Sequence, residues 1–193
     1  MTPEPGGYPV RLQIDFPERL DRLTTLFRPI VAIPIAIILG LIRSSEGGLA
    51  AATALMIIYR RRYPRWWFDF ARELAAFGMR VGAYLVLLMD TYPSTVDEQS
   101  VHFEIDYPDA GRDLNRWLPL VKWFLAIPHY VVLFVLIILA FYAVVIAWFA
   151  ILFTGRHPRP LFDFVVGVAR WTLRVQAYAF LLVTDQYPPF SLR

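Results

Sequence analysis

The sequence predicts a mainly α-helical membrane protein built from two tandem repeats, each with a short β-strand, an apolar helical hairpin and an amphipathic helix. Three observations support this fold class. Hydrophobic residues make up 58% of the 193 residues, compared with about 45–50% in typical soluble domains. Two stretches of about thirty residues hold almost no charge and are long enough to reach across a bilayer core. The second half of the chain repeats motifs of the first half.

The duplication appears as matched motifs at a nearly constant spacing. VRLQIDFP at 10–17 matches VHFEIDYP at 101–108, and FDF at 68–70 recurs 94 residues later. DTYP, which ends at 93, matches DQYP, which ends at 188. These matches place a first membrane repeat at 1–93, a linker at 94–100 and a second membrane repeat at 101–193.

Each repeat opens with a predicted β-strand. Apolar and polar residues alternate over 10–16 and again over 101–107, which is typical of a strand with one buried face. Because an isolated strand is not stable in water, we expect the two strands to pair with each other at the membrane surface.

An apolar stretch follows the strand in each repeat. Residues 123–155 hold no charge, and a straight helix of that length would measure about 50 Å against a hydrocarbon core of about 30 Å. The matching stretch 29–59 is interrupted by RSSEGG at 43–48, a composition that favours a turn. We therefore expect a helical hairpin in each repeat, which either crosses the membrane twice or inserts halfway.

Residues 66–89 and 160–183 predict an amphipathic helix at the end of each repeat. Charged residues fall on one narrow stripe of each helix: Asp69, Glu73 and Arg80 in the first, and Asp163, Arg170 and Arg174 in the second. Such a helix lies in the membrane interface or turns its stripe toward a protein interior.

Arginine-rich turns precede both amphipathic helices, at 60–65 and 156–159. Arginine favours the cytoplasmic side of a membrane, so we expect both turns in the cytoplasm. If both turns lie on the same side of the membrane, each repeat must cross the membrane an even number of times. This arrangement disfavours the inverted repeats that are common in transporters.

We expect the candidate site residues to bind lipid headgroups or to form a polar stripe. They are Arg65, Asp69, Arg80, Asp90, His129, Arg159, Asp163, Arg170, Arg174 and Asp185. Guanidinium groups bind phosphate in a bidentate manner, so Arg65 and Arg159 either recognise anionic lipid headgroups or act as simple interface anchors. Asp69 and Asp163 either cap the helices that follow or stand in their first turn, or they pair with Arg80 and Arg174 around an ion or headgroup.

Aromatic residues near the ends of the amphipathic helices predict anchors at the membrane–water interface, where tyrosine and tryptophan concentrate. We expect this role for Trp66, Trp67, Tyr84, Tyr92, Trp171, Tyr178 and Tyr187.

The sequence carries no motif for catalysis or for a metal ion. It has no glycine-rich phosphate loop, no G-x-S-x-G, no H-E-x-x-H and no cysteine. We expect no enzyme, no cofactor and no metal site; a lipid-modifying enzyme would have only Asp163 or His129 as a base. The net charge is +3, and the densest basic cluster follows an apolar stretch directly. This arrangement is typical of a membrane flank, and we expect no nucleic-acid partner.

The chain resembles an uncharacterised bacterial integral-membrane family, the domain of unknown function four-three-eight-nine, in two tandem copies that cover nearly the whole chain. The resemblance rests on IPH at 127–129, TGRHPR at 154–159, LFDF at 161–164, Arg170-Trp171 with Arg174, and TDQYPPF at 184–190. The first repeat lacks the histidine and the Pro-Phe ending. The resemblance implies a bacterial membrane location and brings no activity. We expect this membrane to be the cytoplasmic membrane.

We expect a non-enzymatic integral membrane protein that serves as a lipid-associated scaffold or as an accessory subunit of a membrane complex, with a capacity to shape the bilayer. Its expected partners are membrane lipids, above all anionic headgroups, and either another membrane protein or a second copy of itself. The alternative is a small transporter or channel whose Asp/Arg stripes line a path between the repeats.

Overall fold

The computed structural model describes residues 8–94 and 99–193, apart from the side chains at 42, 43 and 45. Most of the predicted linker therefore lies outside the described residues. The elements are β1 (Val10–Ile14), α1 (Arg22–Val31), α2 (Ile33–Arg60), α3 (Arg65–Leu85), β2 (Val101–Ile105), a 3-10 turn η1 (Leu118–Leu120), α4 (Lys122–Leu125), α5 (Ile127–Thr154), α6 (Arg159–Gln176) and a π-helical turn η2 (Ala177–Leu181). The fold is mainly helical, as the sequence predicts.

The two strands pair as the sequence predicts. β1 and β2 form an antiparallel two-stranded sheet in which Leu12 lies opposite Phe103. Backbone bonds from Asp15 N to Ser100 O and from Asp106 N to Pro9 O, both 2.9 Å, extend the ladder at each end. The apolar residues of both strands point into the core, and the polar residues point outward.

The predicted helical hairpins are wrong, because α2 and α5 are each one unbroken helix of 28 residues, about 42 Å long. In α2, the Ser44 hydroxyl donates to Leu41 O at 2.6 Å, so this polar residue is satisfied inside the helix. A break would leave backbone groups of two helix ends without partners. That loss outweighs the cost of glycine in a helix interior, which is about 1 kcal/mol per residue.

The real bend in each repeat lies at the Ala-Ile-Pro motif. Ala32 and Ala126 separate the short helices α1 and α4 from α2 and α5. In both cases proline stands in the first turn of the long helix, where its missing N–H costs nothing. The predicted apolar stretch is therefore two helices joined end to end.

The two repeats exchange their N-terminal parts. β1 packs against α6 of the second repeat, β2 packs against α3 of the first, and α1 packs against α5. One hydrophobic cluster contains residues of both repeats, including Leu12, Val81, Val165 and Leu173. The duplication in sequence therefore corresponds to two interlocked halves around a common core.

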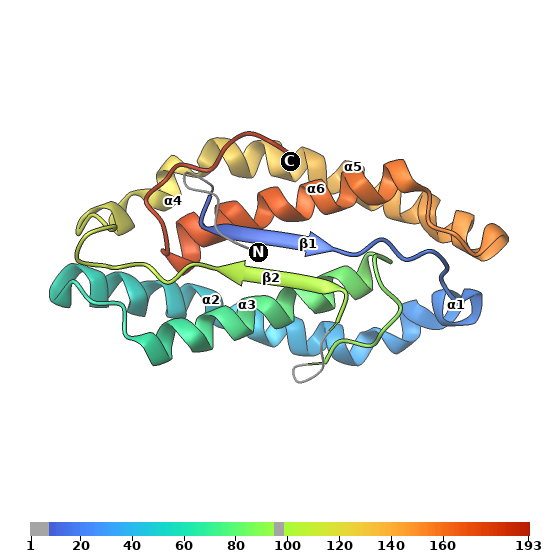
Figure 1. Ribbon diagram of the computed structural model, residues 1–193, viewed down its shortest axis with the longest axis horizontal. Helices are drawn as coiled ribbons and strands as arrows, with labels where there is room; N and C mark the ends of the chain where they lie inside the picture. Colours follow the sequence, from blue (N-terminus) through green and yellow to red (C-terminus); the bar gives the residue numbers. More distant parts are fainter. Residues whose placement is uncertain (1–7, 95–98) are drawn as a thin grey trace.

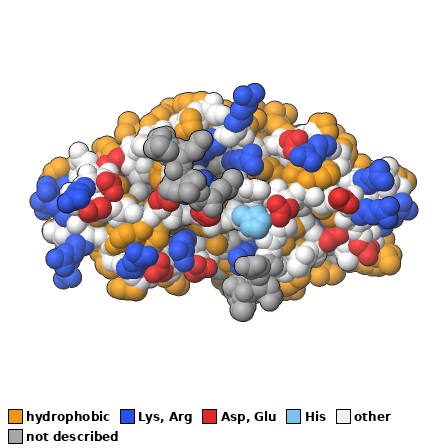
Figure 2. All heavy atoms as spheres, viewed as in Figure 1, with side chains coloured by type: hydrophobic (Ala, Val, Ile, Leu, Met, Phe, Trp, Pro, Cys, Tyr) orange, Lys and Arg blue, Asp and Glu red, His pale blue; other side chains and the backbone are white. Residues whose placement is uncertain are grey.

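The sheet covers α3 and α6, while α2 and α5 lie at the two long edges (Figure 1). Strands and long helices all run along the long axis of the molecule (Figure 1). Figure 2 shows acidic and basic side chains spread over the sheet face, with apolar side chains along the edges. By length and composition, α2 and α5 are the two described helices that could cross a membrane; only 7% and 17% of their most apolar windows are buried.

Candidate functional site

The polar face of the sheet carries linked charges. Arg11 on β1 bonds Glu104 on β2 at 3.2 Å and Asp106, directly after β2, at 3.0 Å. His102, which points outward as its place in the alternation predicts, contacts Asp15 at 3.0 Å. All five side chains are at least one-third exposed, so these pairs are accessible to solvent and contribute little to stability.

A groove lies beside each strand, where β1 meets α6 and β2 meets α3. The groove between β1 and α6 measures about 740 Å³ and is lined by four basic and two acidic side chains: Arg11, Arg159, Arg170, Arg193, Asp15 and Asp163. The groove between β2 and α3 measures about 410 Å³ and is lined by two basic and three acidic side chains: Arg72, Arg80, Glu73, Glu104 and Asp106. The duplicated grooves therefore differ in charge, one basic and one acidic.

The predicted Asp/Arg pairs within the stripes do not form. Arg80 donates to Ser94 O at 2.8 Å, and Arg174 donates to Ser191 O at 3.1 Å. Burial lowers the pKa of Arg174, and nearby Arg170 adds to this effect. Arg170 itself donates to Leu12 O at 2.9 Å, so it ties α6 to β1. These arginines bond backbone segments to α3 and α6.

The two duplicated aspartates lie on the surface. Asp163 pairs with Arg159 at 3.3 Å and Asp69 lies 3.9 Å from Arg72. Neither is a cap, because the residues that precede α3 and α6 are Pro64 and Pro158, which make no side-chain cap bond. The capping prediction is therefore wrong. The prolines already set the chain direction at the helix start.

A buried ion pair occurs once in each repeat at matching positions. The guanidinium of Arg28 contacts Asp90, and the ammonium of Lys122 lies 2.8 Å from Asp185. Each cation also lies over a tyrosine ring, Tyr84 at 4.5 Å and Tyr178 at 5.1 Å. Arg28 and Lys122 stand 94 residues apart in the sequence, as do the two tyrosines.

The backbone contacts of the two ion pairs match as well. Arg28 donates to Met89 O at 2.9 Å, and Lys122 donates to Thr184 O at 2.8 Å. The carboxylates of Asp90 and Asp185 accept the backbone N–H groups of Asp21, directly before α1, and of Asn115, three residues before η1. Each pair therefore joins the start of the apolar segment to the end of the amphipathic helix.

The buried cations were not among the predicted site residues, although Asp90 and Asp185 were. Burial lowers the pKa of Lys122, while the hydrogen bond and the charge of Asp185 raise it. Burial also raises the pKa of Tyr178. A basic residue repeated at a spacing of 94 residues, just before each Ala-Ile-Pro motif, is the sequence signal that identifies Arg28 and Lys122.

His129 lies inside an aromatic cluster away from the charged face. The indole N–H of Trp171 donates to His129 Nδ1 at 3.0 Å. The imidazole stacks on Phe190 with ring centres 4.1 Å apart, and Tyr187 lies at 4.8 Å. This cluster ties the C-terminal segment to the start of α5, so His129 is a packed residue.

The predicted aromatic anchors divide into two groups. Trp66, Tyr92 and Tyr187 are exposed. Tyr84, Trp171 and Tyr178 are buried, and for these three the anchor prediction is wrong. Trp67 is half-buried and donates to Thr53 on α2 at 2.8 Å. The buried group lies where the amphipathic helices need large side chains to cover the ion pairs and the histidine.

The arginine-rich turn between α2 and α3 borders an open hollow of about 900 Å³. Its wall includes Arg60, Arg61, Arg62, Tyr107 and Asp109. Arg65 packs its guanidinium over the ring of Tyr107 at 5.0 Å. Three exposed guanidinium groups around one hollow suit an anionic group such as phosphate.

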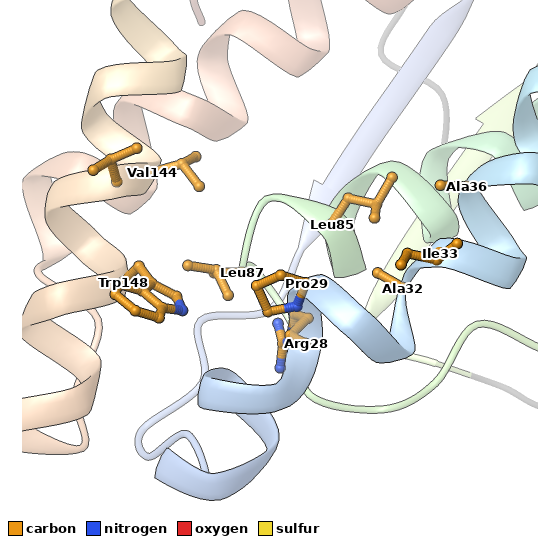
Figure 3. A pocket seen from close by; sticks show the side chains of 10 residues that line it. Arg28, Pro29, Ala32, Ile33, Ala36, Leu85, Leu87, Val144 and Trp148 are labelled. Carbon is orange, nitrogen blue, oxygen red and sulfur yellow. The ribbon is translucent and has the colours of Figure 1, made fainter.

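An apolar pocket of about 350 Å³ lies beside the first ion pair, between the α1–α2 junction, the end of α3 and α5 (Figure 3). Arg28 is its only charged lining residue. Among the described residues, no group of three His, Asp or Glu side chains is placed to hold a metal ion.

Comparison with known proteins gives one family. The family model described as Domain of unknown function (DUF4389) matches residues 22–96 and 116–191, once in each repeat. Both matches leave out the paired strands. No curated protein and no solved structure matches the chain.

Proposed function

The chain belongs to the DUF4389 family, whose function is unknown, and we propose that it is a non-enzymatic, lipid-associated scaffold of the bacterial cytoplasmic membrane. In this proposal α2 and α5 lie embedded in one leaflet, and the charged sheet face looks into the cytoplasm. The arginine hollow at 60–62 holds anionic headgroups.

The exposed apolar surface of the long helices is the observation that carries the proposal. Along α5, one stripe packs on α6 and the remaining faces are apolar and exposed; Phe134 is 68% exposed and Phe153 78%. Monomeric soluble proteins rarely expose an apolar surface of this extent. A helix that is hydrophobic on all faces is buried either in a protein core or in lipid. Because most of α5 is not buried in the protein, we infer that it contacts the bilayer.

The direction of the sheet favours helices that lie along the membrane. Because strands and helices run along the same axis (Figure 1), a crossing α5 would carry the sheet to the middle of the bilayer. Arg11, Glu104 and Asp106, each 36–54% exposed, would then face hydrocarbon. A charged side chain at that depth costs about 2.5–3.5 kcal/mol on insertion scales. With the sheet face toward water, this cost disappears and both arginine-rich turns share one side.

The arginine hollow supplies the headgroup contacts of the proposal. Trp66, next to Arg65, is exposed at the same turn, and tryptophan prefers the headgroup region. Basic side chains near a membrane surface attract anionic lipids by about 1 kcal/mol each. The hollow therefore favours acidic over zwitterionic headgroups.

Two measurements test the scaffold. Membranes that contain the protein are washed with alkaline carbonate, and we expect the protein to stay in the pellet; release into solution contradicts membrane embedding. Phosphatidylglycerol that copurifies in mild detergent is then quantified for the double variant Arg60→Gln/Arg62→Gln. We expect a clear loss of phosphatidylglycerol relative to the charge-matched control Arg19→Gln/Arg22→Gln, whose exposed arginines lie outside the lining of the hollow. If the two variants retain equal amounts of phosphatidylglycerol, the arginine hollow is not the headgroup-binding site.

The transporter alternative remains a prediction with its own test. It requires stripes that line a path between the repeats, whereas Arg159–Asp163 and Arg72–Asp69 pair on the exposed surface. We expect liposomes that hold the protein to show no ion flux above empty liposomes. Flux that Asp163→Asn abolishes would replace the scaffold with a transporter.

A further inference from the structure

The apolar pocket beside Arg28 has the size of a ligand site. Its volume of about 350 Å³ falls within the range of about 300–1,000 Å³ that is common for small-molecule pockets. Figure 3 shows Leu87 between Trp148 on α5 and Pro29 on α1. Leu85, Ala32, Ile33 and Ala36 lie beyond them. Nine of the ten lining residues are apolar.

The pocket opens onto the exposed apolar surface. Ile33 and Val145, which line it, are among the exposed large hydrophobic residues, and Ala36 is exposed as well. If α2 and α5 are embedded as proposed, this opening faces hydrocarbon, and lipid chains are the molecules that meet it.

Arg28, the one charged residue of the pocket lining, has one hydrogen-bond donor without a partner. Arg28 is 2% exposed. Its terminal nitrogens bond Tyr84 O, Met89 O and Asp90, but its Nε has no partner. A buried donor without a partner is costly, and an oxygen acceptor from a ligand would satisfy it.

We propose that this pocket binds one acyl chain of a membrane phospholipid, with the ester carbonyl of that chain accepting the hydrogen bond from Arg28 Nε. The inference rests on the proposed membrane embedding and adds a single defined lipid site to it. The pocket recognises the acyl chain and its ester group. Binding there therefore does not depend on the lipid headgroup or on the arginine hollow.

The matching positions of the second repeat carry different residues. The bulky wall residues Val144 and Trp148 correspond to Ala50 and Ala54, and Ala36 at the open mouth corresponds to Tyr130. Lys122, which replaces Arg28, directs its ammonium to Thr184 and Asp185. We therefore expect one bound chain per protein.

The probe is phosphatidylcholine with brominated acyl chains, titrated into detergent micelles that contain the protein. Bromine quenches nearby tryptophan, and subtraction of the Trp148→Phe titration isolates the Trp148 signal. We expect Trp148 quenching to saturate at one lipid per protein. Ala36→Phe, which fills the mouth, should weaken this binding at least tenfold, whereas Ala51→Phe, an exposed site elsewhere on α2, should leave it within twofold. Thermal melting of both variants verifies that they fold.

The outcomes separate the two proposals. Quenching of Trp148 that rises in proportion to lipid without saturation overturns the site, as does saturation that Ala36→Phe leaves unchanged. In either case, quenching of the exposed Trp66 and Trp123 would still report lipid contact and leave the membrane embedding intact. No quenching of any tryptophan would overturn both.

Discussion

Replacing Asp185 by asparagine tests the buried ion pair of the second repeat. Lys122 is fully buried, whereas Asp185 is 21% exposed. Asparagine keeps an oxygen that can accept the N–H of Asn115 but removes the negative charge. Breaking a buried pair typically costs about 3–5 kcal/mol, and the partial exposure of Asp185 favours the lower end, about 3 kcal/mol. For a chain of this size, that corresponds to a melting temperature about 6–12 °C lower.

The pH dependence separates this variant from its counterpart in the first repeat. Asp185 raises the pKa of Lys122, so its removal lowers that pKa further below the unfolded value of about 10.4. The unfolded state then binds more protons, and stability of the variant rises from neutral pH toward about pH 10. Asp90→Asn leaves a guanidinium, which does not lose its proton in proteins, so no such recovery is expected there.

Both effects are measured by thermal melting in mild detergent between pH 7 and pH 10, with tryptophan fluorescence as the signal of unfolding. The double variant Lys122→Met/Asp185→Asn, which holds no charge at this site, should melt within a few degrees of the wild type, because apolar replacement of a buried pair is often neutral. Equal losses in the single and double variants would refute the reasoning, since the unpaired charge would then not be the cause.

Two further substitutions test other contacts. Arg11→Gln, which removes the exposed bridges to Glu104 and Asp106, should lower the free energy of unfolding by less than about 1 kcal/mol; a larger loss in denaturant titration would mean that the polar face contributes to stability. Gly167→Ala should destabilise by about 1–3 kcal/mol, because an added Cβ would lie 2.9 Å from Leu192 O and from Leu192 Cβ. In the matched control Gly82→Ala on α3, the added Cβ meets nothing within 4 Å, so this substitution should stabilise the protein by about 0.5–1 kcal/mol. Melting temperatures that move in the same direction for both variants would contradict the packing at Gly167.

Local periodicity and internal matching were sufficient to predict the duplication, the strands, their pairing and a helix at the end of each repeat. The helical hairpin was wrong because serine and glycine at 44–48 are weak breakers. They cost little in a helix whose interruption would expose backbone groups. A turn-like residue composition does not show that breaking the helix costs more free energy than keeping serine and glycine inside it.

The site was predicted only in part, because helical periodicity identifies neighbours on one helix and not partners across helices. Asp90 and Asp185 were candidates, but their partners Arg28 and Lys122 lie more than sixty residues earlier in the chain. Arg170 bonds the strand of the other repeat, a contact that depends on the exchange of strands. Only the tertiary structure supplies such pairings.

The orientation of α5 is the central claim, and cysteine labelling tests it most directly because the chain has no cysteine of its own. Arg112→Cys and Arg156→Cys place single thiols at exposed positions before and after α5. Each is exposed to a membrane-impermeant maleimide in intact spheroplasts and in inverted vesicles. A helix that lies in one leaflet predicts that both thiols react only in inverted vesicles. Labelling of the two thiols from opposite sides would show that α5 crosses the membrane and would contradict the account.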